Sequence, residues 1–180
     1  MSARGRRTVA VLLLFVLAAR VQPAAATAPT TMDVGGHRLT RQGQGTRSAF
    51  LAIDLYSVAL YLPRRLADVH RIWDPDIAKA FRVEILYGGS LPDKVPQSWS
   101  QELLPSLTFE QKDAVAEAWA TLKAGDTIRV TYAPEAGTRI FVGERLVIKD
   151  DDDTIMRSFL DLWVGKSPVS KELRGSLLGD

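Results

Sequence analysis

The longest run of apolar positions extends from Phe50 to Leu62 and stops at Pro63. Residues of both parities are apolar along it, which predicts a strand buried on both faces. Pro63 ends this strand because proline cannot donate to a sheet ladder. Asp54 and Tyr56 interrupt the run at the same parity, so the pattern predicts that they project from one face, two residues apart.

Shorter alternating segments predict further strands on both sides of this run. Gly35-Gly36 is a tight-turn signal, which makes the segments beside it a hairpin. Gly43 and Gly45 predict a second turn. Before the hairpin, residues 27–31 are rich in Thr, Ala and Pro and are predicted to be a disordered tail. The predicted strands cover residues 32–34, 37–41, 80–87, 126–132, 138–142 and 145–148.

The start signals Ser90, Pro92 and Asp93 predict a helix over 90–104, and a short one is predicted over 170–178. Apolar residues at helical spacing predict a helix over 108–123 and one more that begins at Asp152 or Asp153 and ends at Gly165. Thr108 and Gln111 fit a capping box at the start of the helix over 108–123. No internal repeat or linker divides the chain. Strands and helices together predict a single α+β domain, an antiparallel sheet with helices covering one face.

The first 26 residues have the pattern of a secretory signal peptide. Three arginines are followed by an apolar run over 8–19 and by Ala24-Ala25-Ala26, small residues at the spacing of a cleavage site. An uncleaved anchor is the alternative, although the run is shorter than the roughly 20 residues that a spanning helix needs. The sequence therefore predicts a periplasmic or secreted protein with one domain over 27–180.

Removing this segment changes the charge of the protein. The whole chain has a net charge of +2 and a pI of ≈ 9.0. Without the four arginines of residues 1–26, 19 of the 23 basic residues remain against all 21 acidic ones, a net charge of −2. The mature chain therefore lacks the basic excess typical of nucleic-acid binding. The chain has no cysteine, which excludes disulfides and a lipid-modified cysteine anchor.

Arg47, Tyr56 and Asp54 are the candidate site residues. Arg47 and Tyr56 are nine positions apart, so on one straight strand they would point to opposite faces. They can meet only across a turn or bulge, or on paired strands. A guanidinium and a phenol together suit a carboxylate, enolate or phenolate oxygen, and Asp54 could orient the arginine. The alternative is a surface Arg47 and a core Tyr56 with its hydroxyl at the sheet edge.

Other polar features indicate structure rather than chemistry. The run Asp150-Asp151-Asp152-Asp153 could bind calcium, but it lacks the ligand spacing of an EF-hand and precedes a helix, where acids stabilise the N-terminus. His37 and His70 have no cysteine partners, so no metal site is predicted. Gly43-Gln44-Gly45 is not a dinucleotide fingerprint, and no cofactor is predicted. The four tryptophans, at 73, 99, 119 and 163, are predicted to be core residues.

The ordered set of motifs resembles the chalcone isomerase-like family, in particular its exported bacterial members. The resemblance covers roughly residues 32–179. It rests on the segments Gly43–Arg47, Ile53–Leu62, Phe81–Tyr87, Lys94-Val95, Gly125-Asp126, Leu162–Ser170 and Leu177–Gly179. It implies an open-faced β-sandwich, with a large antiparallel sheet, helices on one side and an apolar cleft between them.

Members of that family are of three kinds: plant enzymes that close a chalcone to a flavanone, plastid relatives that bind fatty acids through an arginine and a tyrosine, and proteins without known activity. The cleft arginine of the family matches Arg47. The fatty-acid binders have a tyrosine at the position of Tyr56, where the plant enzymes have threonine. The tyrosine and asparagine of the enzymes fall about at Leu91 and Ser98, neither of which keeps that chemistry.

Three hypotheses follow. The resemblance favours non-catalytic binding of a fatty acid or similar apolar acid, with Arg47 holding the carboxylate and Tyr56 donating a hydrogen bond. The second is an isomerase or intramolecular lyase that acts on a chalcone-like enone, with Arg47 stabilising the developing oxygen charge. The third is an envelope interaction module that binds no small ligand.

Overall fold

The computed structural model describes residues 27–49, 53–66 and 68–179. The predicted signal peptide, residues 1–26, lies outside the described residues, and so does 50–52 of the predicted central strand. Within the described part of the chain, no helix is long and apolar enough to cross a membrane.

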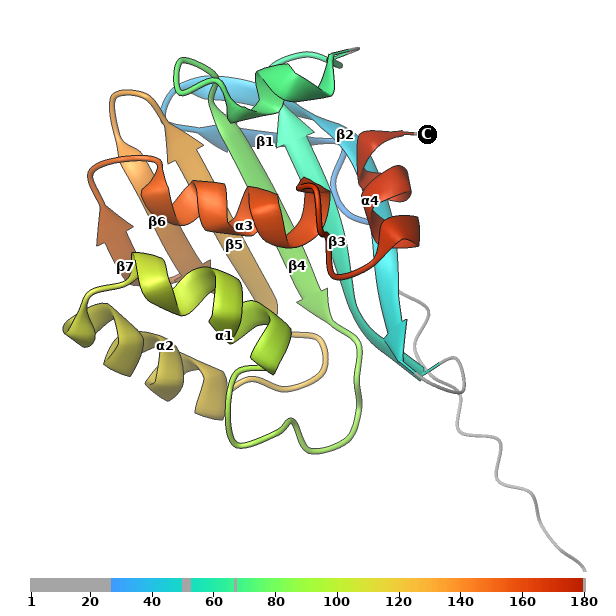
Figure 1. The fold of residues 1–180 in the computed structure, drawn as a ribbon, viewed down its shortest axis with the longest axis vertical. Coiled ribbons are helices and arrows are strands. Elements are labelled where there is room, and N and C mark those ends of the chain that lie inside the picture. Colours follow the sequence, from blue (N-terminus) through green and yellow to red (C-terminus); the bar gives the residue numbers. More distant parts are fainter. Residues whose placement is uncertain (1–26, 50–52, 67, 180) are drawn as a thin grey trace, which may run out of the picture.

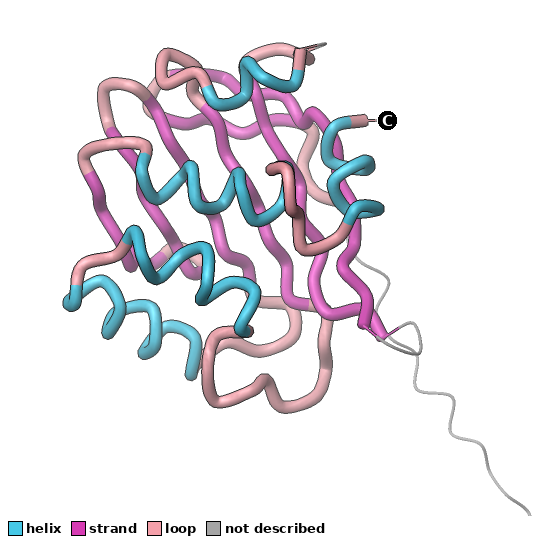
Figure 2. The backbone as a smooth tube through the Cα atoms, viewed as in Figure 1, coloured by secondary structure: helices cyan, strands magenta, loops and turns pink. Residues whose placement is uncertain are grey.

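The described residues form one antiparallel sheet of seven strands in the order β1 to β7, each strand paired with its neighbour in sequence (Figures 1 and 2). This confirms the predicted antiparallel sheet. Gly35 and Gly36 have positive φ values and make the turn of the first hairpin, as predicted. The strands are β1 (Thr31–Val34), β2 (His37–Ala49), β3 (Ile53–Leu62), β4 (Lys79–Ile85), β5 (Thr127–Ala133), β6 (Gly137–Val142) and β7 (Arg145–Asp150).

The α-helices cover one face of this sheet (Figure 1). The predicted capping box of Thr108 and Gln111 opens α2. The helix predicted over 90–104 begins only at Gln97, because a residue before proline is pushed towards extended backbone and Pro96 is the N-cap residue. The helices are α1 (Gln97–Leu103), α2 (Phe109–Ala120), α3 (Thr154–Val164) and α4 (Lys171–Leu178), with short 3-10 helices η2 (Val69–Trp73) and η3 (Leu104–Ser106).

The main core lies between the sheet and these helices. Helix α3 contributes the apolar stripe predicted from its sequence, and Ile155, Phe159 and Trp163 are all buried. Trp163 packs edge-on against Phe81 of β4 at a ring-centroid distance of 4.8 Å. Burying a large apolar side chain stabilises a fold by about 1.5–3 kcal/mol, so this layer holds most of the apolar contribution to stability.

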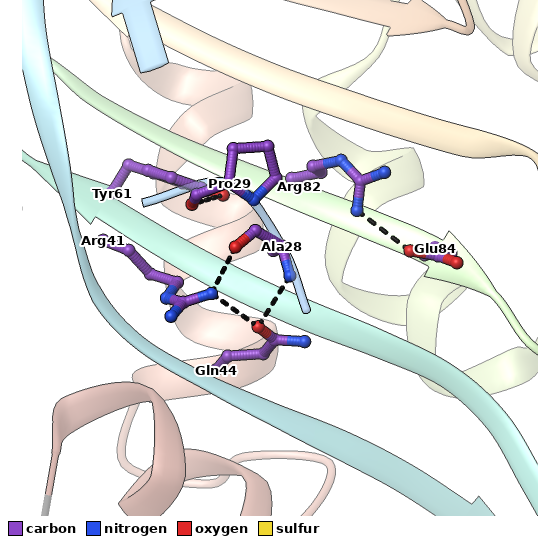
Figure 3. Close-up of polar contacts among 7 residues, drawn as sticks. All are labelled: Ala28, Pro29, Arg41, Gln44, Tyr61, Arg82 and Glu84. Carbon is purple, nitrogen blue, oxygen red and sulfur yellow. Dashed lines mark hydrogen bonds and ion pairs between the residues drawn. The ribbon is translucent and has the colours of Figure 1, made fainter. Parts of the chain in front are cut away.

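The opposite face of the sheet is covered where β2, β3 and β4 meet. The N-terminal segment (residues 27–30) crosses it, and Ala28 is buried. The predicted disordered tail is therefore wrong for these residues, because tertiary hydrogen bonds hold their backbone (Figure 3). Tyr61 Oη donates to Pro29 O at 2.8 Å, Ala28 N donates to Gln44 Oε1 at 3.0 Å, and Arg41 Nη1 donates to Ala28 O.

This cover explains why β3 is buried on both faces. From Tyr56 to Leu62 every residue is buried, which confirms the prediction for this part of the strand. Val58, Leu60 and Leu62 belong to the core under the helices, whereas Ala59 and Tyr61 pack under the N-terminal segment.

Candidate functional site

Arg47 and Tyr56 are cross-strand neighbours. They are partners in the antiparallel register of β2 and β3, so their side chains share one face of the sheet. Two residues nine positions apart can meet across a turn or bulge, or on paired strands. The structure has the paired strands. Tyr56 belongs to the core under the helices, so this shared face is the helix-covered one.

Asp54 does not join this pair. The register shifts between Arg47 and Ser48, so that Ser48 pairs with Asp54 and Leu55 is left as an extra residue in β3. Ser48 Oγ donates to Asp54 Oδ1 at 2.7 Å. Because alternation along β2 places Ser48 opposite to Arg47, Asp54 turns away from Tyr56. The predicted shared face of Asp54 and Tyr56 is wrong, since parity cannot foresee an extra residue between them.

Two glycines of β2 bring α4 close to the sheet beside Arg47. A Cβ atom at Gly43 would lie 2.2 Å from Ser176 O, and one at Gly45 would lie 2.8 Å from Ser176 Cβ. The prediction of a turn at these glycines is therefore wrong: they lie inside β2 and allow helix and strand backbones to approach closely.

Arg47 follows the two glycines on the same face and lies near the start of α4. Arg47 Nη1 donates to Ser48 O at 2.7 Å. The pKa of Glu172 in the first turn of α4 is lowered by its own backbone N–H and the Ser170 hydroxyl, and further by the charge of Arg47. The guanidinium is half-buried, so it keeps access to solvent at the edge of the helix-covered layer.

Tyr56 lies inside a cluster of aromatic side chains. It is 7% exposed, and its ring meets that of Trp99 edge-on at 5.3 Å. Trp99 Nε1 donates to Tyr56 Oη at 3.3 Å. Burial raises the pKa of Tyr56, while the indole N–H groups of Trp99 and Trp163 and the charge of Arg47 partly oppose that rise. The sequence placed both tryptophans in the core and carried no signal that they converge on this phenol.

The space between the sheet and helices α1 and α2 is almost filled. The inner pocket there has a volume of only ≈ 40 Å³, and Trp99 separates it from Tyr56. A hollow of ≈ 380 Å³ opens at the surface beside it, and Trp119 and Leu122 line both spaces. The inner pocket is lined by Val95, Trp99, Leu103, Val115, Ala118, Trp119, Leu122, Ile128, Ile140, Val142, Val147 and Phe159.

A larger pocket of ≈ 470 Å³ is lined by other residues than the candidate pair. It is formed by η2, the end of α3 and α4, and its lining includes neither Arg47 nor Tyr56. Most of its polar lining residues, among them His70, Glu102 and Lys166, are exposed. We therefore take the apolar layer beside Tyr56, and not this pocket, as the candidate site.

Asp153 is the N-cap residue of α3, which confirms the predicted start of this helix, although its side chain makes no capping hydrogen bond. Asp152 Oδ1 accepts from the backbone N–H of Thr154 at 2.7 Å, and this N–H lowers the pKa of Asp152. Asp153 pairs with Arg157 one turn later at 2.7 Å. In the described residues, no three His, Cys, Asp or Glu side chains group to hold a metal ion.

Lys79 is a buried charged residue that the sequence did not single out. It lies at the start of β4, is 1% exposed, and its Nζ donates to Asp74 O at 2.8 Å. Its ammonium also lies over the ring of Tyr132, 5.2 Å from the centroid. Burial lowers the pKa of Lys79 to about 8, which the charge of Asp153 partly opposes.

The sequence matches the model of chalcone isomerase-like proteins over residues 20–179, so the chain belongs to the chalcone isomerase-like family. Among solved structures it is similar to the crystal structure of a fatty-acid binding protein from Arabidopsis thaliana. That likeness has 18% sequence identity, covers 84% of this chain and 90% of that chain, and has a TM-score of 0.56. A comparison with curated proteins gives no match.

These comparisons confirm the predicted family and the open-faced α+β fold. At 18% identity the likeness shows the fold, and not the ligand. At the two positions aligned with enzyme residues, Leu91 lies in the loop before α1 and Ser98 is exposed on α1. It is the next residue, Trp99, that contacts Tyr56.

Proposed function

We propose that this protein is an exported, non-catalytic binder of a fatty acid or similar apolar carboxylate. The observation that carries the proposal is the cross-strand pairing of Arg47 and Tyr56 on the helix-covered face, at the end of a layer lined by apolar side chains. A half-buried guanidinium and a phenol suit a carboxylate head, and the apolar layer suits an alkyl chain. The fatty-acid binding relative from Arabidopsis thaliana has the same fold.

The alkyl chain would occupy the inner pocket and extend towards the surface hollow. Sites for small molecules usually have volumes of roughly 300–1,000 Å³, so the ≈ 40 Å³ of the inner pocket must widen on binding. Helix α2 is suited to that movement, because only Ala118 and Trp119 of its twelve residues are buried. Rotation of Trp99 would join the pocket to the Tyr56 hydroxyl.

Lipid bound to the purified protein tests this proposal. Mass spectrometry of the organic extract of gently purified protein should find a fatty acid or related amphiphile. Calorimetric titration with dodecanoate should then show binding that Arg47→Ala weakens about tenfold or more, the loss expected for a charge-assisted hydrogen bond. Arg64→Ala is the matched control, because this arginine is exposed in the bend after β3.

An empty extract together with unchanged dodecanoate affinity in Arg47→Ala would reject the proposal. The exported location has a separate test, based on the small residues before Thr27. Amino-terminal sequencing of the protein from the periplasmic or secreted fraction should begin at Thr27. A protein that keeps Met1 and remains in the cytoplasm contradicts export.

Two observations favour a second candidate, an envelope interaction module that binds no small ligand. The inner pocket is nearly filled by side chains, and Phe109 at the start of α2 is 78% exposed. Exposed large apolar residues are frequent in protein contact sites. A protein that yields no lipid and does not bind dodecanoate would favour this candidate over the first.

A further inference from the structure

Trp163 carries a buried hydrogen-bond donor without an acceptor. Its side chain is fully buried among Phe81, Trp99 and Phe159, with ring-centroid distances of 4.8, 5.5 and 5.3 Å. Its Nε1 is buried, and among the described residues no atom accepts a hydrogen bond from it. Buried donors are nearly always paired, because an unpaired one loses its bonds to water without replacement. This indole N–H therefore needs an explanation.

The unpaired N–H lies beside the hydroxyl of Tyr56. It lowers the pKa of this phenol as a hydrogen-bond donor does, like the N–H of Trp99, yet its geometry does not meet that of a hydrogen bond, so the donor is close to the hydroxyl and still unpaired. Trp99 Nε1 already donates to Tyr56 Oη at 3.3 Å. An indole nitrogen can only donate, so two obligatory donors and one hydroxyl converge at this point. The charge of Arg47 acts on the same hydroxyl from the neighbouring strand.

A group that only accepts hydrogen bonds would satisfy this arrangement. An ionised carboxylate has two oxygens and no hydrogen, whereas an alcohol brings a further donor. Hydrogen bonds to an ionised acceptor are roughly twice as strong as bonds between neutral groups. The polar end of the site is thus better matched to an ionised acid than to a neutral lipid of the same length.

We propose that the indole N–H of Trp163 is a ligand-binding donor that selects an ionised carboxylate head group. This inference rests on the proposed function and extends it from Arg47 and Tyr56 to a tryptophan of α3. Trp99 lines the inner pocket and contacts Tyr56, so an entering carboxylate would displace the Trp99 ring and take a hydrogen bond from Trp163. Arg47 supplies positive charge at the edge of the helix-covered layer, and the Trp163 N–H supplies selectivity for an ionised carboxylate inside it.

The test compares Trp163→Phe with Trp119→Phe. Both changes keep an aromatic ring and remove an indole N–H, but the N–H of Trp119 is already paired with Pro92 O at 2.8 Å. Affinities for dodecanoate and dodecan-1-ol are measured by calorimetric titration of each variant. Trp163→Phe should weaken dodecanoate binding about tenfold and leave dodecanol binding within about twofold. Trp119→Phe should change both affinities by the same factor, because Trp119 lines the pocket for the chain.

Thermal unfolding provides a second readout that a purely structural role would move differently. Replacing Trp163 by 3-benzothienyl-alanine keeps the ring volume and removes only the N–H, so the loss of an unpaired donor should leave the Tm equal to or above that of the wild type. A markedly lower Tm of this isosteric variant would mean that the N–H has a partner inside the protein, and it would overturn the inference. An unchanged ratio of dodecanoate to dodecanol affinity in Trp163→Phe would overturn it as well.

Failure of this inference is distinguishable from failure of the proposed function. If Arg47→Ala loses dodecanoate binding while Trp163→Phe keeps it, the proposed function stands and only the role of Trp163 is rejected. If the wild-type protein binds neither dodecanoate nor dodecanol, both are rejected together.

Discussion

The helix-covered face of the sheet is filled by large aromatic and aliphatic side chains, whereas the covered part of the opposite face is filled mostly by alanines around Tyr61 and Leu39. Under the helices, Phe81 and Trp163 interlock with further aromatic rings. Under the N-terminal segment, Ala59 and Ala80 surround Tyr61. The first layer rests on buried apolar volume, and the second on a short segment whose backbone is held by hydrogen bonds (Figure 3).

The difference shows where a ligand site can form. A layer of large rings that meet edge-on can rearrange when one ring rotates, and the candidate pair Arg47 and Tyr56 borders that layer. The opposite face has its polar groups engaged: Arg82 pairs with Glu84 at 3.0 Å, and Tyr61 holds Pro29. Measurements that distinguish the loss of buried side-chain volume from the loss of a hydrogen bond therefore test this difference between the two faces.

The largest effect is expected from opening a hole in the helix-covered layer. Phe81→Ala should lower the free energy of unfolding by about 3–5 kcal/mol, because it removes a fully buried ring and leaves a cavity against Trp163. Urea denaturation followed by tryptophan fluorescence measures this loss. Leu146→Ala is the control; this residue is 47% exposed and should cost less than about 0.5 kcal/mol. A loss below about 1 kcal/mol for Phe81→Ala would show that the layer is not tightly packed.

A smaller effect, dependent on pH, is expected from the charge buried at the end of the same layer. Burial lowers the pKa of Lys79 to about 8, whereas a lysine in the unfolded chain titrates near about 10.4. Between these values the unfolded state binds more protons, so the free energy of unfolding rises with pH. From pH 8 to 9.5 the rise should reach about 2 kcal/mol.

Urea denaturation of wild type and Lys79→Met at pH 7.5, 8.5 and 9.5 measures this rise. Lys79→Met should remove it, and Lys149→Met should keep it because that side chain is 59% exposed. The pH range of this experiment ends below the pH at which the buried tyrosines ionise, because burial raises the pKa of Tyr56, Tyr61 and Tyr132 above 10. An equal rise in Lys79→Met would assign the pH dependence to another group.

Much of the helix-covered face could be predicted from the sequence, because large apolar residues repeat there with a regular period. Alternation located β4 to β7, and the stripe over Ile155, Phe159 and Trp163 located α3. The pairing of Arg47 with Tyr56 was one of the geometries that spacing allows. Pattern alone could not select it, because selection depends on the register of two strands.

The features that the sequence did not predict depend on contacts between distant segments. An extra residue, Leu55, turns Asp54 away from Tyr56, and nothing in the pattern marks it. Glycine favours turns and also close backbone approaches, so Gly43 and Gly45 fit both descriptions until α4 is placed. The N-terminal segment resembles a tail in composition, and its hydrogen bonds with Gln44, Arg41 and Tyr61 form only once the sheet is in place.

The smallest predicted effect concerns the hydrogen bonds that hold the N-terminal segment on the sheet. Tyr61→Phe removes the hydroxyl that donates to Pro29 O and should lower the free energy of unfolding by about 1 kcal/mol. Tyr132→Phe is a matched change on the helix-covered face, because Tyr132 Oη donates to Pro75 O at the same 2.8 Å. The two variants should therefore lose similar global stability in urea denaturation.

Their local effects should differ. Hydrogen exchange of the Ala28 amide, which donates to Gln44 Oε1, reports on release of the N-terminal segment. Tyr61→Phe should accelerate this exchange about fivefold, as a local loss of about 1 kcal/mol implies, and Tyr132→Phe should leave it near the wild-type rate. Equal acceleration in both variants would mean that the segment opens only when the whole domain unfolds. The N-terminal segment and the helix-covered layer would then be one cooperative unit, despite their different chemistry.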